Sequence, residues 1–236
     1  MRLWSGTSGF SYAEWKGAFY PEDLPQSGFL SYYGQHLNSV EINNTFYRLP
    51  KAEMLEKWRS QVPEDFRFIL KASQRITHRK RLKEAEEPLE YLVSTAKGAL
   101  GGVMGPLLFQ LPPYFRKNVD RLRAFLEAMP DGVQAAFEFR HESWFEEDTY
   151  EALAEGGAAL VAADTGEGDA PVVGTAGFGY ARLRRPGYTD EELRRWAERF
   201  RQESWSDLYV FFKHEDEATG PALAARFNNV WSGNTS

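Results

Sequence analysis

Several apolar segments of this sequence contain or end in a side chain that could move a proton or bind a charged ligand. Three of these side chains are carboxylates, those of Glu41, Glu138 and Asp164. Cationic and amide side chains occupy the same kind of position: Lys71, Arg140, Arg182, Lys213, Gln110 and Asn43. Paired carboxylates can serve as general acid and base, and Lys and Arg bind and neutralise anions. The sequence therefore indicates chemistry on, or binding of, a charged small molecule.

A histidine, two aromatic residues and a hydroxyl residue accompany this group. His141 titrates in the range that suits proton transfer at neutral pH, although a loop histidine can equally serve only to hydrogen-bond its own loop. Tyr12 and Trp144 are candidates for the walls of a ligand pocket, and the alternative is that they anchor their loops on the neighbouring helices. Thr7, or Ser8 beside it, would add a hydroxyl group from the first apolar segment.

Cofactor motifs are sparse in this chain. The three carboxylates and His141 form an oxygen-rich set that could hold Mg²⁺ or Mn²⁺, but the neighbouring Lys and Arg side chains would repel the cation. We therefore assign no metal ligands and keep a divalent metal as an alternative. Zero cysteines exclude disulfides, thiolate nucleophiles and zinc ribbons. The sequence contains no Gly-x-Ser-x-Gly elbow, Walker sequence or Rossmann fingerprint.

The elements that must position these groups are eight short apolar segments rich in β-branched or aromatic residues. They cover residues 3–8, 39–43, 66–71, 106–111, 134–140, 159–164, 178–183 and 208–213. Most of the intervening stretches have helical periodicity, for example Leu193, Trp196, Ala197 and Phe200 after a capping box that begins at Thr189. Strands that alternate with helices imply parallel pairing through right-handed crossovers.

The fold that these elements predict is a single (β/α)₈ TIM-type barrel of the α/β class that spans residues 1–236. We expect one irregular unit between residues 164 and 178, where small residues leave no room for a full helix. Because side chains alternate along a strand, the bulky apolar positions should face the helices, which turns the charged positions into the barrel. The expected inward residues are Glu41, Lys71, Gln110, Glu138, Arg140, Asp164, Arg182 and Lys213.

Active sites of such barrels lie at the carboxyl ends of the strands, which is where these residues would gather. Buried ions must pair or bind a ligand, so one alternative is a salt-bridge layer that only closes the barrel. Three carboxylates against four cations leave a slight positive excess, which favours an anionic ligand.

The overall charge is acidic, at −6 with a pI near 5.4, which argues against a wholly basic nucleic-acid-binding surface. A local basic cluster remains, and its simplest interpretation is a solvated surface: Arg75, Arg79, Lys80, Arg81 and Lys83. Neither a secretory signal nor a membrane-spanning segment is evident, so we expect a cytoplasmic protein with no membrane partner. The sequence does not indicate an oligomeric state.

In its motifs the chain resembles the domain-of-unknown-function-72 family, also called YecE-like proteins, over nearly its whole length. The matching stretches are Gly6-Thr7-Ser8-Gly9-Phe10, Ser39-Val40-Glu41-Ile42-Asn43, Ile76-Thr77-His78, Gln110-Leu111-Pro112-Pro113, Glu138-Phe139-Arg140-His141 and Tyr180-Ala181-Arg182-Leu183. The resemblance implies a TIM barrel and no established reaction. The chain departs from the family pattern at Arg184-Arg185, where the family commonly continues His-Gly, and near Lys213, where an Asn is expected.

Taken together, the residues favour an enzyme, hydrolase-like, that acts on an anionic or sugar-containing small molecule at the barrel mouth. In this hypothesis Glu138 is the general acid/base and Asp164 or Glu41 is its partner carboxylate. Nucleic-acid binding or phosphodiester cleavage is a first alternative, by analogy with metal-dependent endonuclease barrels. A non-catalytic ligand-binding module is a second.

Overall fold

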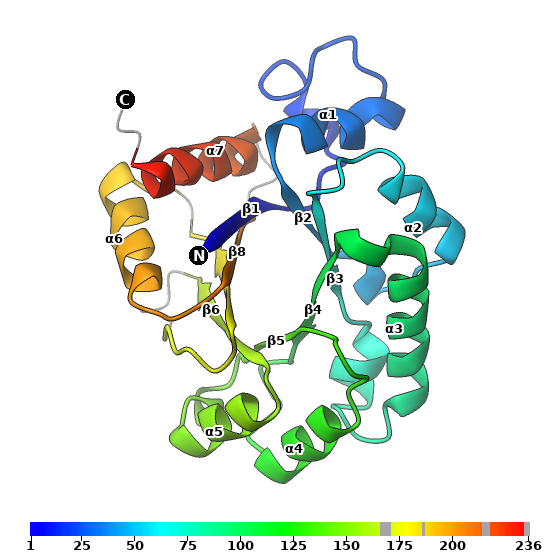
Figure 1. Cartoon of the computed structure of the whole chain (residues 1–236), viewed down its shortest axis with the longest axis vertical. Coiled ribbons are helices and arrows are strands. Elements are labelled where there is room, and N and C mark those ends of the chain that lie inside the picture. Colours follow the sequence, from blue (N-terminus) through cyan, green and yellow to red (C-terminus); the bar gives the residue numbers. More distant parts are fainter. Residues whose placement is uncertain (166–170, 186, 214–217, 234–236) are drawn as a thin grey trace.

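Eight parallel strands, hydrogen-bonded in chain order, close into a barrel in the computed structural model of the chain (Figure 1). The structure describes residues 1–165, 171–185, 187–213 and 218–233. The strands are β1 (Arg2–Ser8), β2 (Ser39–Ile42), β3 (Arg67–Lys71), β4 (Met104–Gln110), β5 (Ala135–Glu138), β6 (Ala159–Asp164), β7 (Phe178–Leu183) and β8 (Asp207–Phe212). This closed barrel confirms the predicted (β/α)₈ fold.

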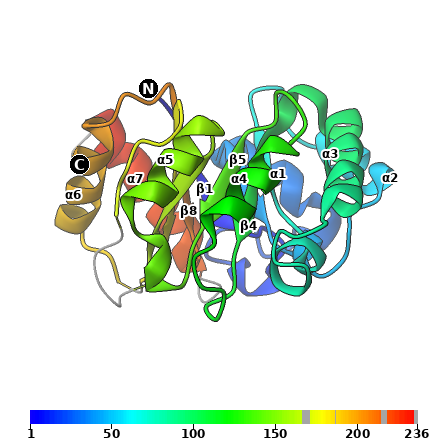
Figure 2. The same ribbon diagram turned by 90° about the horizontal axis from the view of Figure 1, so that it is seen from below.

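Helices surround the barrel on its outer side, as Figure 1 shows, and α4 and α5 lie side by side in both Figure 1 and Figure 2. The α-helices of the described residues are α1 (Phe29–His36), α2 (Ala52–Arg59), α3 (Glu86–Leu100), α4 (Val119–Glu127), α5 (Glu147–Glu155), α6 (Asp190–Arg201) and α7 (Thr219–Ser232). The connection between β6 and β7 is the irregular one: residues 171–177 form no helix, and residues 166–170 lie outside the described part.

Helix α6 illustrates how local sequence fixes these elements. The Thr189 hydroxyl accepts the amide of Glu192 at 3.2 Å, and the Glu192 carboxylate accepts the amide of Thr189 at 2.8 Å, so the predicted capping box is present. The apolar stripe that follows is buried against the barrel, with Leu193, Trp196, Ala197 and Phe200 as its members. Capping and burial together therefore fix where this helix begins and which face it buries, and the helix packs beside α7.

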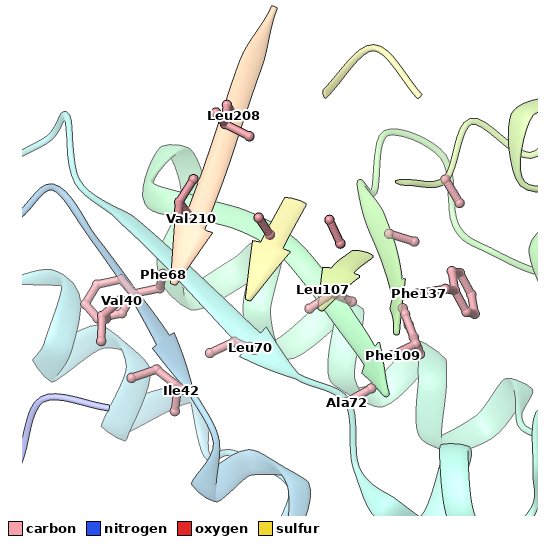
Figure 3. Close-up of a cluster of buried hydrophobic side chains, with 14 of the residues drawn as sticks. Val40, Ile42, Phe68, Leu70, Ala72, Leu107, Phe109, Phe137, Leu208 and Val210 are labelled. Atoms are coloured by element: carbon pink, nitrogen blue, oxygen red, sulfur yellow. The ribbon is translucent and has the colours of Figure 1, made fainter. Parts of the chain in front are cut away.

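Alternation along the strands divides the apolar side chains into two clusters. The outer cluster lies between strands and helices; Figure 3 draws part of it, including Val40, Phe68, Leu107 and Phe137. The inner cluster fills the barrel and contains Trp4, Ile69, Leu108, Ala136, Ala159, Val161, Phe178, Tyr180, Tyr209 and Phe211. On six of the strands, the inward positions beyond this inner cluster hold polar or charged side chains.

None of the helices in the described ranges is long and apolar enough to cross a membrane.

Candidate functional site

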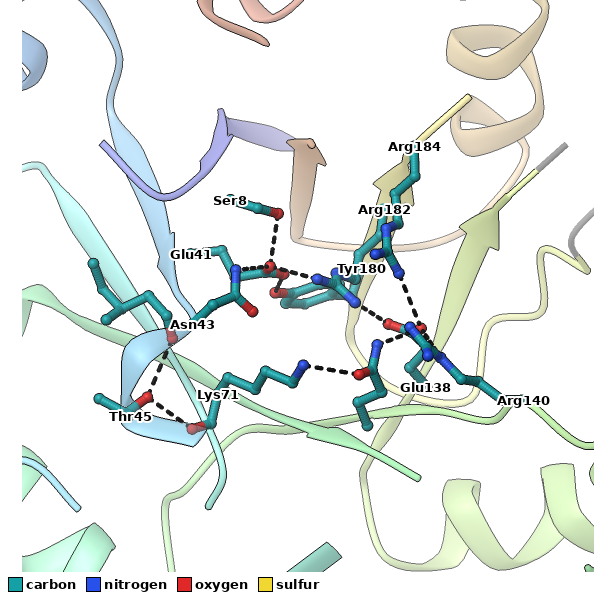
Figure 4. Close-up of polar contacts among 12 residues, drawn as sticks. Ser8, Glu41, Asn43, Thr45, Lys71, Glu138, Arg140, Tyr180, Arg182 and Arg184 are labelled. Carbon is teal, nitrogen blue, oxygen red and sulfur yellow. Dashed lines mark hydrogen bonds and ion pairs between the residues drawn. The ribbon is translucent and has the colours of Figure 1, made fainter. Parts of the chain in front are cut away.

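An arginine between two carboxylates forms the centre of the barrel mouth. Glu41 lies near the end of β2, Glu138 ends β5 and Arg182 lies near the end of β7, and all three are almost completely buried. The Arg182 Nη2 group donates to Oε1 of Glu41 at 2.8 Å, and its Nη1 group donates to Oε2 of Glu138. Figure 4 shows the guanidinium lying between the two carboxylates. Strands from different parts of the sequence thus meet in one buried ion cluster.

Glu41 is held by three further donors. The Ser8 hydroxyl donates to Oε1 at 2.8 Å, the phenol of Tyr180 donates to Oε2 at 2.7 Å, and the Asn43 amide donates to Oε1 at 3.1 Å. Both carboxylate oxygens therefore accept hydrogen bonds from protein groups, which satisfies a buried anion.

Glu138 has further partners, of which Gln110 is buried and two arginines lie nearer to solvent. The Gln110 amide donates to Oε1 at 2.6 Å and the Arg140 Nε group donates to the same oxygen at 3.2 Å. Arg184 adds a guanidinium nitrogen 3.8 Å from that oxygen. The side chain of Arg140 is 36% exposed and that of Arg184 is 19% exposed, so both cations line the open side of the cluster.

Lys71 closes the remaining side of the mouth. It ends β3 on the same face as the buried Ile69, and its Nζ donates to Oε1 of Gln110 at 2.8 Å. The ring of Phe46 lies against the amine, with its centroid 4.4 Å from Nζ. In the described ranges no carboxylate lies within 4.0 Å of this amine. The two carboxylates of the mouth, Glu41 and Glu138, pair directly with Arg182 instead.

The carboxylates of the cluster are held in the ionised form. Burial alone would raise the pKa of Glu138, but the positive charges of Arg182 and Arg140 lower it to about 2. Burial acts in the same way on Glu41, and the charge of Arg182 with the hydrogen bonds from Tyr180 and Ser8 brings its pKa below the ordinary value. Both groups are therefore anions at neutral pH.

The pKa of the Lys71 amine is lowered as well, but for an amine this favours the uncharged form. Burial lowers the pKa of Lys71, the charge of Arg182 lowers it further, and the two carboxylates only partly offset this, so that it reaches about 8. His78 lies near this amine on the turn after β3; burial and the charges of Lys71 and Arg140 lower the pKa of its ring. Lys71 thus loses its proton far more readily near neutral pH than an ordinary lysine does.

The charges of the mouth do not cancel. Two carboxylates are set against four cationic side chains, which leaves two positive charges in excess: Glu41 and Glu138 against Lys71, Arg140, Arg182 and Arg184. Because Arg182 is the buried partner of both carboxylates, the excess is carried by the more exposed groups at the opening.

Asp164 does not point into the barrel, contrary to our expectation. Its strand partners on the same face, Leu160 and Ala162, belong to the outer cluster. Its carboxylate accepts a hydrogen bond from the Tyr188 phenol at 2.7 Å, and Nε of Arg185 lies 3.8 Å away. The reason is local. Strand β6 carries small alanines on both faces, so the size of its side chains does not indicate which face points into the barrel.

Trp144 and Thr7 also differ from expectation. Trp144 is completely buried, stacks on Phe139 at 4.5 Å between ring centroids and donates through its indole nitrogen to the Phe115 carbonyl. It anchors its loop and forms no pocket wall. Thr7 faces the outer cluster, where its hydroxyl lies 2.9 Å from that of Tyr33, and the neighbouring Ser8 supplies the hydroxyl of the site.

The other candidates lie nearer the periphery. The ring of His141 accepts the amide of Ser143 at 3.2 Å and so caps the turn after β5. Lys213 directly follows β8 and is exposed. Tyr12 donates to the Ser8 carbonyl at 2.8 Å and lines a cavity of about 610 Å³ between the loop after β1 and helix α2. Asn43 lines this cavity too and connects it to Glu41.

Nothing in the described ranges brings three or more His, Asp or Glu side chains together as a metal site. Arg182 lies between Glu41 and Glu138, where a cation would need to bind, and Asp164 faces away from them. The donor set therefore does not fit a divalent metal, because a guanidinium already occupies the position between the two carboxylates.

Two residues of the site, Tyr180 and Arg184, were not predicted from the sequence. A third, Ser8, was predicted only as an alternative to Thr7. Tyr180 lies two residues before Arg182 on the same face of β7, a spacing that could have identified it. Arg184 continues that face by two more residues past the strand end. Its side chain contributes a cation to the mouth.

Fold and site together define a TIM barrel whose carboxyl-terminal mouth is lined by charged side chains. The chain belongs to the family whose description reads "Protein of unknown function DUF72", and the family model matches residues 4–235.

Two curated proteins and one solved structure are among the proteins to which the chain is similar. The protein YunF of Bacillus subtilis is 33% identical over 142 residues, which cover 57% of this chain and 50% of YunF. YecE of Escherichia coli K12 is 35% identical over 118 residues, 49% of this chain and 43% of YecE. The chain thus spans about half the length of these curated relatives. A DUF72 family protein from Thermotoga maritima superposes with a TM-score of 0.84 at 29% identity, over 98% of this chain and 100% of that one.

Proposed function

We propose that this protein is an enzyme that binds a small anionic molecule at the barrel mouth, such as a sugar phosphate or a carboxylic acid, and transfers a proton to or from it. The observation that carries the proposal is the excess of two positive charges, located on groups near solvent. Arg140 and Arg184 present guanidinium groups beside the opening, and such groups bind phosphate and carboxylate oxygens through paired hydrogen bonds.

Lys71 is the proton-transfer group that the geometry favours over the two carboxylates. A general acid or base works best when its pKa lies near the working pH. The pKa of Glu138 is about 2, so it holds no proton to donate at pH 7 and is a weak base. The pKa of Lys71 is about 8, and its amine lies at the end of a barrel strand, where catalytic groups of this fold lie. Glu41 and Glu138 then serve to hold Arg182 in place and to contribute to the electrostatic potential at the mouth.

The binding half of the proposal is tested by titrating the protein with inorganic phosphate in a calorimeter. We expect saturable binding that weakens at least about tenfold in Arg140→Gln, because a charge-assisted contact is lost. The matched control is Arg123→Gln on α4, whose guanidinium pairs with Glu155 away from the mouth. Absence of phosphate binding to the wild type, or an equal loss in both variants, would contradict the proposal.

The enzymatic half is tested with a mixture of sugar phosphates and carboxylic acids, analysed by mass spectrometry before and after incubation. We expect at least one compound to be converted by the wild type and none by Lys71→Met. Binding without conversion of any bound compound would instead support the non-catalytic module.

One observation favours a second candidate, nucleic-acid binding. Arg75, Arg79, Arg81 and Lys83 are exposed on the segment that follows β3. Two of these residues, Arg75 and Lys83, already have acidic partners, Glu87 and Glu84 respectively, which weakens the case. Affinity for DNA or RNA that falls steeply with salt would support this candidate, and affinity independent of salt would remove it.

A further inference from the structure

The amine of Lys71 combines burial with the lack of a direct carboxylate partner among the described residues. Its hydrogen-bond acceptor there is the Gln110 side-chain oxygen, a neutral group, and the Phe46 ring covers one side. Two neutral neighbours stabilise an ammonium ion much less than a carboxylate does. A larger fraction of this side chain is therefore in the unprotonated form, which is a nucleophile, than at an ordinary lysine.

Other nucleophiles of the mouth are engaged. The Ser8 hydroxyl and the Tyr180 phenol each donate their proton to Glu41, and burial raises the pKa of Tyr180 well above its usual value. Neither group has a base of suitable pKa to activate it, since Glu41 is held in the ionised form by Arg182. Lys71 is left as the nucleophile that can act without an added base.

We propose that Lys71 forms an imine with a small aldehyde or ketone that carries a phosphate or carboxylate group. This inference rests on the anion binding proposed above: Arg140 and Arg184 hold the anionic group, and the carbonyl carbon then lies toward the amine. The substrate class is thereby narrowed from any small anion to an anionic carbonyl compound.

The step balances without an oxidant, a reductant or a further reactant. The lone pair of Nζ attacks the carbonyl carbon, a C–N bond forms, and the electron pair of the C=O π bond moves to oxygen. Both hydrogens of the amine then leave with that oxygen as one molecule of water, and a C=N bond remains. A protonated imine withdraws electrons from the adjacent carbon, which suits proton removal or carbon–carbon bond cleavage there.

The reactivity of the amine fits this step. With a pKa of about 8, about a tenth of the Lys71 side chain is unprotonated at pH 7, against roughly one part in 3,000 for a lysine of pKa 10.5. Imine formation should therefore concentrate on this lysine, although exposed lysines are more accessible to the probe.

Borohydride trapping tests the inference directly. Protein is incubated with dihydroxyacetone phosphate at pH 7, sodium borohydride reduces any imine to a stable amine, and peptide mapping by mass spectrometry locates the added mass. We expect the adduct on Lys71, with at least tenfold less labelling in Arg140→Gln and with dihydroxyacetone, which lacks the phosphate. Lys71→Arg should abolish the adduct, whereas the control Lys97→Arg, an exposed lysine on α3, should leave it unchanged.

The outcomes separate this inference from the proposed function. Phosphate binding without an adduct on Lys71 would overturn the imine and leave the anion site in place. Absence of both phosphate binding and the Lys71 adduct would overturn the anion site and the imine together. Labelling spread over surface lysines and unchanged in Lys71→Arg would also overturn the inference, because a non-specific reaction would then account for the adduct.

Discussion

Arg182 donates to Glu41 at 2.8 Å across the barrel interior, although 141 positions separate the two residues in the sequence. Its other terminal nitrogen reaches Glu138, so a single buried guanidinium joins β7 to β2 and β5. Removing one member of such a network leaves an uncompensated buried charge, which costs several kcal/mol. The network therefore determines both the stability of the mouth and the charge that it offers to a ligand.

The first prediction concerns Glu138. We expect Glu138→Gln to lower the free energy of unfolding by about 3 kcal/mol, because Arg182 loses one of its two buried counter-charges. Urea denaturation measures the change. The control Glu142→Gln, at an exposed residue of the next turn, should change the stability by less than about 0.5 kcal/mol. Equal stabilities of the two variants would show that the buried pair contributes nothing.

Acid stability gives the second prediction. The folded-state pKa of Glu138 is about 2, below its ordinary value of 4.5. Between these two pH values the folded chain therefore binds fewer protons than the unfolded chain. The contribution of Glu138 to stability is complete above about pH 4.5 and is lost as the pH falls toward 2. Denaturation curves across that window should show a steeper loss for the wild type than for Glu138→Gln. Parallel curves would contradict a lowered pKa for the Glu138 carboxyl in the folded chain.

Alkaline stability gives the third prediction, in which stability again rises with pH. The pKa of Lys71 is lowered from 10.5 to about 8 in the folded chain, so between these values the unfolded chain binds more protons and stability rises with pH. Lys71→Met should lack this rise and should be about 3 kcal/mol more stable than the wild type at pH 7, the free-energy equivalent of lowering the pKa from 10.5 to about 8. A Lys71→Met variant that is less stable at pH 7 would show that the amine has an unrecognised stabilising partner.

A fourth prediction lies outside the site. Thr189→Ala should destabilise the protein by about 1 kcal/mol, because the capping hydrogen bond to the Glu192 amide is lost. Thr189→Ser, which keeps the hydroxyl, should restore most of the stability. Thermal unfolding of the three proteins makes the comparison, and phosphate affinity should be the same in all of them.

The sequence was sufficient for the fold because the eight strands are short, apolar and separated by helices with clear periodicity. Observed strand ends lie within two residues of those predicted. The inward positions of Glu41, Lys71 and Glu138 follow from strand phase, since each has a bulky outward neighbour. Arg182 also faces inward, although the bulky residues before it on β7, Phe178 and Tyr180, lie on the same inner face. The same argument was wrong for Asp164, because alanines on both faces of β6 leave its phase unmarked.

Loop residues were harder to predict because their contacts are tertiary. Trp144 is buried against Phe139 and Phe115, which no local pattern distinguishes from an aromatic residue at a pocket mouth. The acid/base role that we expected of Glu138 depends on its pKa, and that is set by Arg182 and Arg140. Charge pairing between distant strands is visible only once the barrel is closed.

The central claim is that the mouth holds a readily deprotonated Lys71 amine beside an anion site. The most direct test is to measure the pKa of Lys71 by nuclear magnetic resonance. The chemical shift of the side-chain carbon next to the amine is followed through a pH titration, with and without inorganic phosphate. We predict a pKa of about 8 without phosphate and a higher pKa with phosphate, because a bound anion stabilises the ammonium ion. A pKa near 10.5 that does not respond to phosphate would contradict the account.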